Sequence, residues 1–322
     1  MNARIFLTQL LGALGLIVIL GFNVIIMDWW ERKLVGHIHR RPGPMHTGWH
    51  GILQPFADML KMLSKEDIVP DRADRLFFWL GPAVAVVPAF MALAVLPLAP
   101  GFALADIGNG LFFVFAMQTI MPFGYTLIGW SGHNKWSLVG ALRSAAQLIS
   151  YEIPMLIVAL GILLAAGSAR LTDIVNAQST VWYAVKQPIG LLIFFITAVA
   201  EMNRSPFDMP EAESELVAGI HTEYAGMKFG LVMMAEYTAM LVGSWMIVLL
   251  FLGGWHLWPL PPSPVWLVLK LYLVQSGIIW LRGTYLRLRV DTMMEMSWKY
   301  LIPASLANLM LVGVLATTFK GF

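Results

Sequence analysis

The sequence predicts an all-α, polytopic membrane protein with about eight transmembrane helices and one amphipathic helix at the membrane surface. Of its 322 residues, 58% are hydrophobic and only 12% are charged, whereas soluble domains usually carry about 25% charged residues. The mean hydropathy of +0.72 indicates the same class, because so few charges could not cover a soluble globule of this size. We expect a single integral membrane domain over residues 1–322.

Eight apolar stretches are candidate membrane spans, since a helix needs roughly 20 mostly apolar residues to cross the hydrocarbon core. The first follows Arg4 and is longer than the apolar region of a signal peptide, so we expect it to be retained. The fifth is short for a straight crossing. The predicted spans are 5–27, 77–98, 108–130, 150–167, 187–201, 230–252, 265–284 and 300–318.

Lysines and arginines are distributed unevenly between the two sides of this arrangement. Sixteen of them fall in the first, third, fifth and seventh loops, four fall on the opposite side, and Lys270 lies inside the seventh span. Cytoplasmic loops are enriched in these residues. We therefore expect both termini on the periplasmic side of a cell inner membrane, with the long odd-numbered loops in the cytoplasm.

The sequence contains no cysteine, which excludes disulfides and cysteine-held zinc or iron–sulfur clusters. We therefore expect this chain to bind no redox cofactor of its own. His37, His39, His46 and His50 lie in one loop, but their spacing matches no metal-binding pattern, and no metal site is predicted. The basic residues form no continuous stripe, so no nucleic-acid partner is expected.

The first long loop contains an amphipathic segment, WHGILQPFADMLKMLSKE (49–66), with apolar residues at helical spacing. Its charged residues, among them Asp58 and Lys61, make it too polar to span the membrane. We expect it to lie flat at the surface. It could anchor the protein there or line an entrance for a lipid-like substrate, and the sequence leaves both interpretations open.

The segment that follows the fifth span is strongly acidic. It reads EMNRSPFDMPEAESELVAGIHTE (201–223) and holds six carboxylates against one arginine, Arg204. On a helix, Glu211 and Glu215 would share one face, with Glu213 on another. Some of these carboxylates must be paired, solvated or protonated at neutral pH, and the cluster could hold shared protons.

Two prolines interrupt this acidic segment, Pro206 and Pro210, on either side of Phe207-Asp208-Met209. They predict a broken backbone with fixed turns in place of a continuous helix. A solvated acidic loop is the alternative. The apolar residues of the segment and the two adjoining spans favour a more enclosed position.

Three further ionisable residues lie near or inside apolar stretches: Glu152 at the start of the fourth span, Glu236 inside the sixth and Lys270 inside the seventh. A charge at the bilayer centre costs at least about 2.5–3.5 kcal/mol, so each is a candidate for function. A protonated Glu236 could alternatively form a helix–helix hydrogen bond. A row of buried carboxyl groups predicts proton transfer, without its direction.

Five long segments, spread in order over nearly the whole chain, carry a family resemblance. They read ERKLVGHIHRRPGP (31–44), GILQPFADMLKMLSKEDIVP (51–70), GWSGHNKWSLVGALRSAAQLISYE (129–152), AEMNRSPFDMPEAESELVAGIHTEYAGMKFG (200–230) and YLRLRVDTMMEMSWKYLIPASLAN (285–308). These segments resemble the signature segments of the NuoH family, which are membrane subunits of the proton-pumping NADH:quinone oxidoreductase, complex I. Strings of this length are far more specific than a short motif.

The resemblance implies a membrane subunit that forms much of the quinone chamber and couples quinone reduction to proton translocation. It implies other complex I subunits as partners, including the peripheral-arm quinone-site and terminal iron–sulfur subunits and small membrane-arm subunits. Quinone would be the substrate, while FMN and iron–sulfur clusters would belong to those partners. The chain would be inactive alone.

The resemblance also assigns residues to two roles. The quinone passage maps onto Arg32, Arg41, Gln54, Asp58, Phe207 and Asp208. The acidic path towards the pumping subunits maps onto Glu152, Glu201, Asp208, Glu211, Glu213, Glu215, Glu223 and Glu236. His39 replaces a glutamine that is common in the family, and Leu286 a proline, so the type of quinone stays open.

Two other functions fit parts of the pattern. One is the equivalent subunit of a membrane-bound hydrogenase or of a ferredoxin- or F420-linked complex, which the copurifying subunits would reveal. The other is a stand-alone ion-coupled secondary transporter, which also uses buried charges and broken helices. Such a transporter would show paired repeats and would transport when purified alone.

Overall fold

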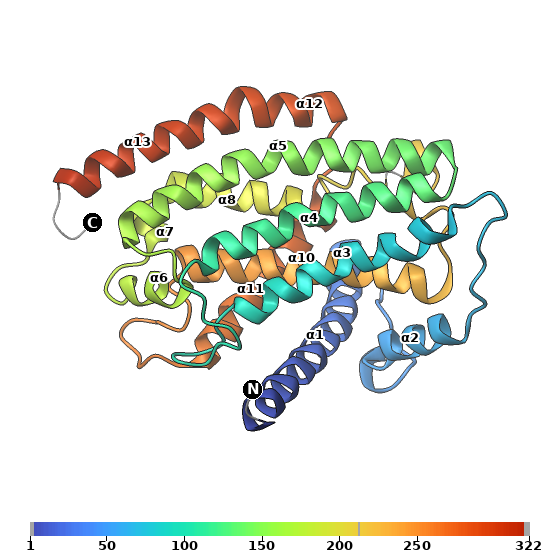
Figure 1. Cartoon of the computed structure of the whole chain (residues 1–322), viewed down its shortest axis with the longest axis horizontal. Helices are drawn as coiled ribbons and strands as arrows, with labels where there is room; N and C mark the ends of the chain where they lie inside the picture. Colours follow the sequence, from blue (N-terminus) through green and yellow to red (C-terminus); the bar gives the residue numbers. More distant parts are fainter. Residues whose placement is uncertain (1–2, 212, 319–322) are drawn as a thin grey trace.

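The predicted all-α class is confirmed. The computed structural model describes residues 3–211 and 213–318, with side chains for residues 11–211 and 215–318. Over these residues the regular secondary structure is helical, apart from two isolated β-bridges within loops (Figure 1).

Seven helices in the described part of the chain are long and apolar enough to cross a membrane. They are α1 (Ala3–Ile38), α3 (Arg75–Val95), α4 (Gly110–Ser131), α5 (Lys135–Ala166), α10 (Gly226–Phe251), α11 (Pro264–Thr284) and the continuous helix formed by α12 (Val290–Glu295), η3 (Met296–Leu301) and α13 (Ile302–Thr318). The predicted fifth span is α8 (Pro188–Glu201), whose 14 residues extend about 21 Å at 1.5 Å per residue. The chain is therefore a multi-pass membrane protein.

The remaining helices are short and connect the long ones. The predicted amphipathic segment forms η1 (Trp49–Gly51) and α2 (Gln54–Ser64), and α2 packs beside α1 and α10. The others are α6 (Leu171–Ala177), α7 (Tyr183–Lys186), α9 (Glu213–Leu216) and η2 (Gly219–His221).

Three long helices extend beyond the predicted spans, which corrects those boundaries. Helix α1 continues past Met27 to Ile38, and the last helix begins at Val290, ten residues before the predicted start at 300. Helix α5 begins at Lys135 and not at residue 150, because Asn134 caps it by accepting a hydrogen bond from the backbone N–H of Trp136 at 2.9 Å. Glu152 therefore lies in the middle of a helix and not at its start.

Helix α10 is the central helix of the bundle. Most of its residues are buried, including every one from 235 to 251, and it packs against α1, α2, α3, α8 and α11. Helices α1 and α13 lie at the periphery (Figure 1) and expose apolar side chains such as Val18 and Met310. Apolar surface of this kind fits contact with lipid or with neighbouring subunits.

Lys270, which the sequence marks as a candidate for function, has a structural role in this fold. Its buried Nζ donates hydrogen bonds to the backbone carbonyls of Leu252 at 2.6 Å, Gly254 at 3.1 Å and His256 at 2.6 Å. These carbonyls follow the C-terminus of α10, where intrahelical donors are missing. The lysine thus closes the end of the central helix.

The chain between α8 and α9 is irregular, as Pro206 and Pro210 predict. Gln147 of α5 holds this segment in place, because its side-chain amide donates to the carbonyls of Ala200 at 2.6 Å and Phe207 at 2.8 Å. Further along, a side chain at Gly219 would meet the Pro210 carbonyl oxygen at 1.7 Å. Only glycine permits this close approach, which brings η2 beside the acidic segment.

Candidate functional site

A cavity of about 580 Å³ lies between α1, the loop 39–44 and α10. Its wall is rich in charged groups. They include the carboxylates of Asp28 and Glu31 and the guanidinium groups of Arg32, Arg41 and Arg282, and the neutral phenol of Tyr237 lies beside them.

A second, apolar cavity of about 180 Å³ lies beneath α2, between α1 and α10. Its wall contains the flexible side chains of five methionines, Met59, Met62, Met227, Met233 and Met234. Asp28, Arg32, Met233 and Tyr237 line both cavities, which therefore adjoin. Together they form an amphipathic space with an apolar part under α2 and a charged part at the loop.

Glu31 is the centre of the charged part. Its carboxylate is buried and contacts Arg204 at 3.3 Å and also Arg282. These two cations stabilise it, since a buried charge without a partner is strongly destabilising. The Tyr237 hydroxyl lies 3.1 Å from Oε2 of Glu31 and 3.2 Å from Oδ1 of Asp28. A phenol carries one hydrogen, so Tyr237 can donate to only one of these carboxylates at a time.

A row of polar contacts leads from Asp28 to the amphipathic helix α2. Arg32 contacts Asp28 at 3.0 Å and Asp58 at 2.7 Å. The side-chain amide of Gln54 donates to Asp58 at 3.1 Å. The structure thus brings Arg32, Gln54 and Asp58 together, and places Arg41 on the wall of the larger cavity.

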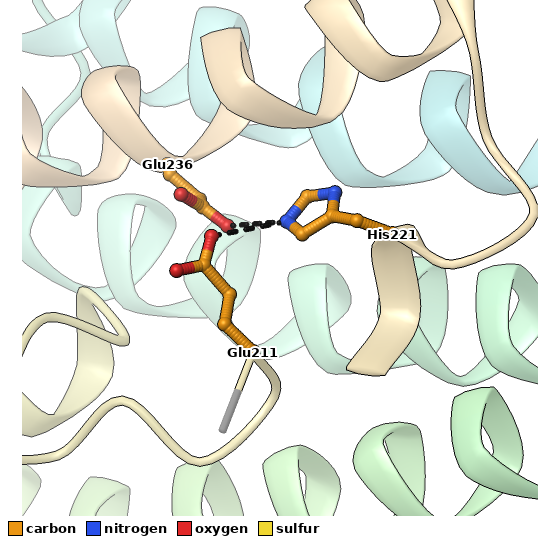
Figure 2. Close-up of side chains that lie close together, drawn as sticks. All are labelled: Glu211, His221 and Glu236. Atoms are coloured by element: carbon orange, nitrogen blue, oxygen red, sulfur yellow. Dashed lines mark hydrogen bonds and ion pairs between the residues drawn. The ribbon is translucent and has the colours of Figure 1, made fainter. Parts of the chain in front are cut away.

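A cluster of two carboxylates and one histidine, in which Glu236 and His221 are buried and Glu211 is half-buried, lies further inside the protein (Figure 2). Nε2 of His221 lies 3.1 Å from Oε1 of Glu211 and 3.4 Å from Oε1 of Glu236. The three residues come from the loop after Pro210, from η2 and from α10. Three successive segments of the chain therefore meet at one nitrogen.

The protonation of this cluster follows from its contacts. Burial lowers the pKa of His221, but its hydrogen bonds with Glu211 and Glu236 and their charges outweigh burial and raise the pKa to about 10. Burial raises the pKa of Glu211, but the hydrogen bond and the charge of His221 lower it below its usual value. His221 is therefore protonated at neutral pH and donates to the carboxylates.

One ligand atom from each of these three side chains lies within 4.8 Å of the others, which is a spacing that a bound cation also requires. Three ligands are fewer than the four of a closed structural zinc site. Each of the three already takes part in the hydrogen bonding of the cluster. The geometry favours a shared proton over a bound cation.

Arg204 connects the cavity to this cluster. Its buried guanidinium contacts Glu31, and its central carbon lies 4.4 Å from the ring centre of Tyr237. Burial lowers the pKa of Arg204. Its electrostatic interactions with Tyr237, Glu236 and Glu211 outweigh burial, so the pKa is raised above its ordinary value. One cation therefore interacts with both groups of acids.

Asp208 is a buried acid of the irregular segment. It contacts Arg287 at 2.9 Å, and the neighbouring backbone N–H of Leu288 donates to the carbonyl of Pro206 at 3.1 Å. Burial and the charge of Glu211 outweigh the attraction of Arg287 and raise the pKa of Asp208 to about 7. Asp208 can therefore change its charge near neutral pH.

Glu211 and Glu215 do not share a helical face, so the expected stacking of this pair is wrong. Glu211 turns towards His221, whereas the half-exposed Glu215 contacts Arg143 at 2.5 Å. The reason is that α9 covers only Glu213–Leu216. The side chain of Glu213 lies outside the described residues.

The remaining predicted carboxylates lie at other points of the bundle. Glu223 accepts a hydrogen bond from the side chain of Asn134 at 2.7 Å. Glu152 accepts one from Thr119. Glu201 ends α8 and has a buried oxygen, Oε2, for which the described residues provide no hydrogen-bond partner.

Two residues of the predicted quinone passage lie away from the cavities. Phe207 packs in the core against Tyr151, with 5.4 Å between ring centres, and Asp208 pairs with Arg287. Neither is among the lining residues of the two cavities. Gln54 does not line them either, but it contacts Asp58, which lines the apolar cavity.

Sequence reasoning missed several residues of the site, namely Asp28, Glu31, Tyr237, His221, Arg282 and Arg287. Asp28 and Glu31 lie just beyond the predicted end of the first span, where the apolar pattern gives no reason to continue the helix. His221 and Tyr237 stand within two residues of flagged carboxylates, Glu223 and Glu236. A search for polar partners of those carboxylates could have found them.

The fold and the site define a polytopic helical membrane protein in which an amphipathic cavity adjoins an internal network of titratable groups. The chain belongs to the NADH dehydrogenase family, whose model matches residues 11–313. This match confirms the family resemblance of its five signature segments.

Several relatives are similar over nearly their whole length, and each is named as the H subunit of NADH-quinone oxidoreductase. The protein of Geobacillus thermodenitrificans is 47% identical over 315 residues, which are 96% of this chain and 94% of the relative. That of Dehalococcoides mccartyi is 46% identical over 299 residues, 92% and 84% of the two chains. That of Bacillus mycoides is 47% identical, with 96% and 94% covered.

Proposed function

We propose that this chain is the membrane subunit of an NADH-quinone oxidoreductase in which quinone is bound and its reduction is coupled to proton translocation. The position of Tyr237 carries the proposal. Its side chain lines both cavities and its hydroxyl contacts both Asp28 and Glu31. Space for an amphipathic ligand is thereby joined directly to buried acids.

Quinone has an apolar tail and a polar head, and both fit the adjoining cavities. The methionine-lined part under α2 suits a flexible hydrocarbon chain. The charged part supplies hydrogen-bond donors for the oxygen atoms of the head. The residues of this chain that belong to the passage are Arg32, Arg41, Gln54 and Asp58. Phe207 and Asp208 lie outside the two cavities and act on the passage without lining it.

The electrons come from FMN and iron–sulfur clusters held by partner subunits. The residues of this chain bind and orient quinone and respond to the negative charge that develops on its head. Asp28 or Glu31 responds first, because the hydroxyl of Tyr237 can switch its hydrogen bond from one carboxylate to the other.

Arg204 passes this response inwards. A change in the charge of Glu31 alters the balance of attractions on Arg204, and hence the field at Glu236 and Glu211. Protons then redistribute along the acids assigned to the path, which are Glu152, Glu201, Asp208, Glu211, Glu213, Glu215, Glu223 and Glu236.

The uneven distribution of basic residues supports an orientation with both termini periplasmic and α2 on the cytoplasmic side of the cell inner membrane. The cytoplasmic loops then face the peripheral-arm quinone-site and terminal iron–sulfur subunits. The exposed apolar faces of α1 and α13 suit lipid or small membrane-arm subunits. Nucleic acid is not a partner, and the chain works as one membrane domain that is inactive alone.

A photoreactive quinone analogue tests the proposal in membranes that contain the assembled complex. Label should be found by mass spectrometry on peptides of α1 and α10, and excess quinone should prevent it. An Arg32→Gln variant should lose most of this labelling, whereas a Lys299→Gln variant, altered at an exposed position, should keep it. Label that is absent from α1 and α10, or that excess quinone does not displace, would overturn the assignment.

A further inference from the structure

A third cavity, of about 390 Å³, lies between α2 and residues 218–229. One wall is formed by the α2 side, with the exposed side chains of Lys61 and Lys65 and with Asp58. The opposite wall is formed by the chain that leads from η2 into α10, including Ala218, Ala225 and His221. The cavity is thus polar at its rim.

His221 connects this cavity to the buried cluster. Within the described residues, it is the one member of the Glu211–His221–Glu236 cluster that lines the cavity. Its Nε2 faces the two carboxylates (Figure 2), its ring packs edge-on to Phe229, and its buried Nδ1 has no hydrogen-bond partner among the described side chains and backbone. The histidine therefore lies between a space for water and two acids.

This cavity is distinct from the proposed quinone passage. It shares no lining residue with the charged cavity. With the apolar cavity it shares only Asp58 and Met62, both on α2. Helix α2 therefore separates two routes into the protein, and quinone in its own passage would leave the second route open.

We propose that the cavity between α2 and residues 218–229 is a proton entrance, filled by water, that leads from the aqueous phase to His221 independently of the quinone passage. This inference rests on the proposed function. The proton on Nε2 of His221 passes to an oxygen of Glu236, which becomes a carboxylic acid and leaves a neutral imidazole with its hydrogen on Nδ1. The ring then turns so that the bare Nε2 reaches the cavity, takes up a proton from water there and turns back to the carboxylates.

His221 has titratable and charged groups on the cavity side and on the inner side. Asp58 and Lys61 of α2, Lys65 just after it and Tyr224 line the same cavity as His221. Glu211, Glu236 and Arg204 lie behind it. The raised pKa of His221, about 10, keeps the ring charged at neutral pH, so a proton is held beside the two acids until their charge changes.

The absence of cysteine makes a direct test possible, because one introduced cysteine is then the single thiol of this chain. In Ala225→Cys, the thiol lies on the cavity wall. Inverted vesicles containing the assembled complex are treated with a water-soluble, trimethylammonium-bearing methanethiosulfonate. We expect modification of this chain by mass spectrometry, and a fall of about fivefold or more in proton pumping and quinone reduction together.

Controls separate this effect from general damage. The KM for quinone should stay unchanged, and a thiol reductant should restore both rates. Ala239→Cys places a thiol on α10 where the side chain is buried, and it should resist the reagent and keep its rates. If Ala225→Cys does not assemble, Ala218→Cys on the same wall takes its place with the same expectations.

Two outcomes would overturn the proton entrance: a cavity thiol that does not react in the assembled complex, or one that reacts without changing pumping. Labelling by the photoreactive quinone is measured on the same vesicles. If that labelling persists, the proposed quinone function stands while the entrance fails. Loss of quinone labelling from unmodified wild-type complex would instead count against the quinone function itself.

Discussion

The phenol oxygen of Tyr237 lies 3.1 Å from Oε2 of the buried Glu31, on the shared wall of the two adjoining cavities. Tyr237→Phe removes this hydroxyl and keeps the ring that packs on Arg204. We expect quinone reduction and proton pumping to fall together by at least about tenfold, because a positioned proton donor typically contributes about 10²–10⁴-fold. Both rates are measured in inverted membrane vesicles with equal amounts of assembled complex.

Tyr272→Phe on α11 is the matched control, since this tyrosine lines neither cavity. Its rates should stay near those of wild type. Equal rates in the two variants would remove Tyr237 from the coupling mechanism.

Asp58 of α2 is expected to act at the quinone passage and not in proton transfer. It contacts Arg32 at 2.7 Å and lines the apolar cavity. Asp58→Asn weakens this partly exposed ion pair, so the KM for quinone should rise about threefold to tenfold while kcat changes little, as expected for a loss of about 1 kcal/mol in binding.

Steady-state kinetics over a range of quinone concentrations checks this expectation. Glu66→Gln, an exposed neighbour in the same loop, should leave the KM unchanged. A fall in kcat at constant KM would assign Asp58 to the proton path instead.

The buried Asp208 should make the complex sensitive to pH. Its pKa of about 7 lies above the ordinary value of 3.8, because burial and the charge of Glu211 oppose ionisation. The folded state therefore holds this proton more tightly than the unfolded chain, and the contribution of Asp208 to stability falls as pH rises from 3.8 to about 7. Above that range the contribution is constant.

Asp208→Asn cannot ionise and should lack this dependence. The apparent unfolding temperature of wild-type complex should fall relative to that of the variant as pH rises towards 7, and the difference should then level off. The variant should also reduce both quinone reduction and pumping. A difference in unfolding temperature that is the same at every pH would contradict the assignment.

Lys270 should matter for stability and not for proton transfer. Lys270→Met leaves the carbonyls of Leu252, Gly254 and His256 without their shared donor, which costs on the order of 3 kcal/mol. We expect less assembled complex and a lower apparent unfolding temperature, with unchanged turnover for each complex that does assemble. Normal stability with lost pumping would show that the lysine belongs to the proton path after all.

Much of the fold follows from the sequence because the membrane permits few architectures. A bilayer leaves only helices or closed barrels for a spanning backbone, so long apolar stretches identify the spans. The ends of the helices were harder to predict. Helix α1 continues to Ile38 because Glu31 and Arg32 find partners on other segments, and apolar periodicity contains no information about such partners.

The site, like the fold, could be predicted from the sequence only in part. Carboxylates in apolar surroundings stand out in the sequence, and Glu236 and Asp208 are indeed buried. Their partners His221 and Arg287 are ordinary residues at positions that only the folded chain brings close. The stacking of Glu211 on Glu215 failed because it assumed a helix, while Gly219 and Pro210 fold the chain into a close turn there.

Glu236 provides the most direct test of the claim that buried acids couple quinone chemistry to proton movement. It lies on the central helix, 3.4 Å from His221, and is not itself among the lining residues of the quinone cavities. Proton pumping and quinone reduction are measured in proteoliposomes with purified Glu236→Gln complex, after native gels have established normal assembly. The account predicts that both fall by about tenfold or more, and wild-type pumping by a fully assembled variant would contradict it.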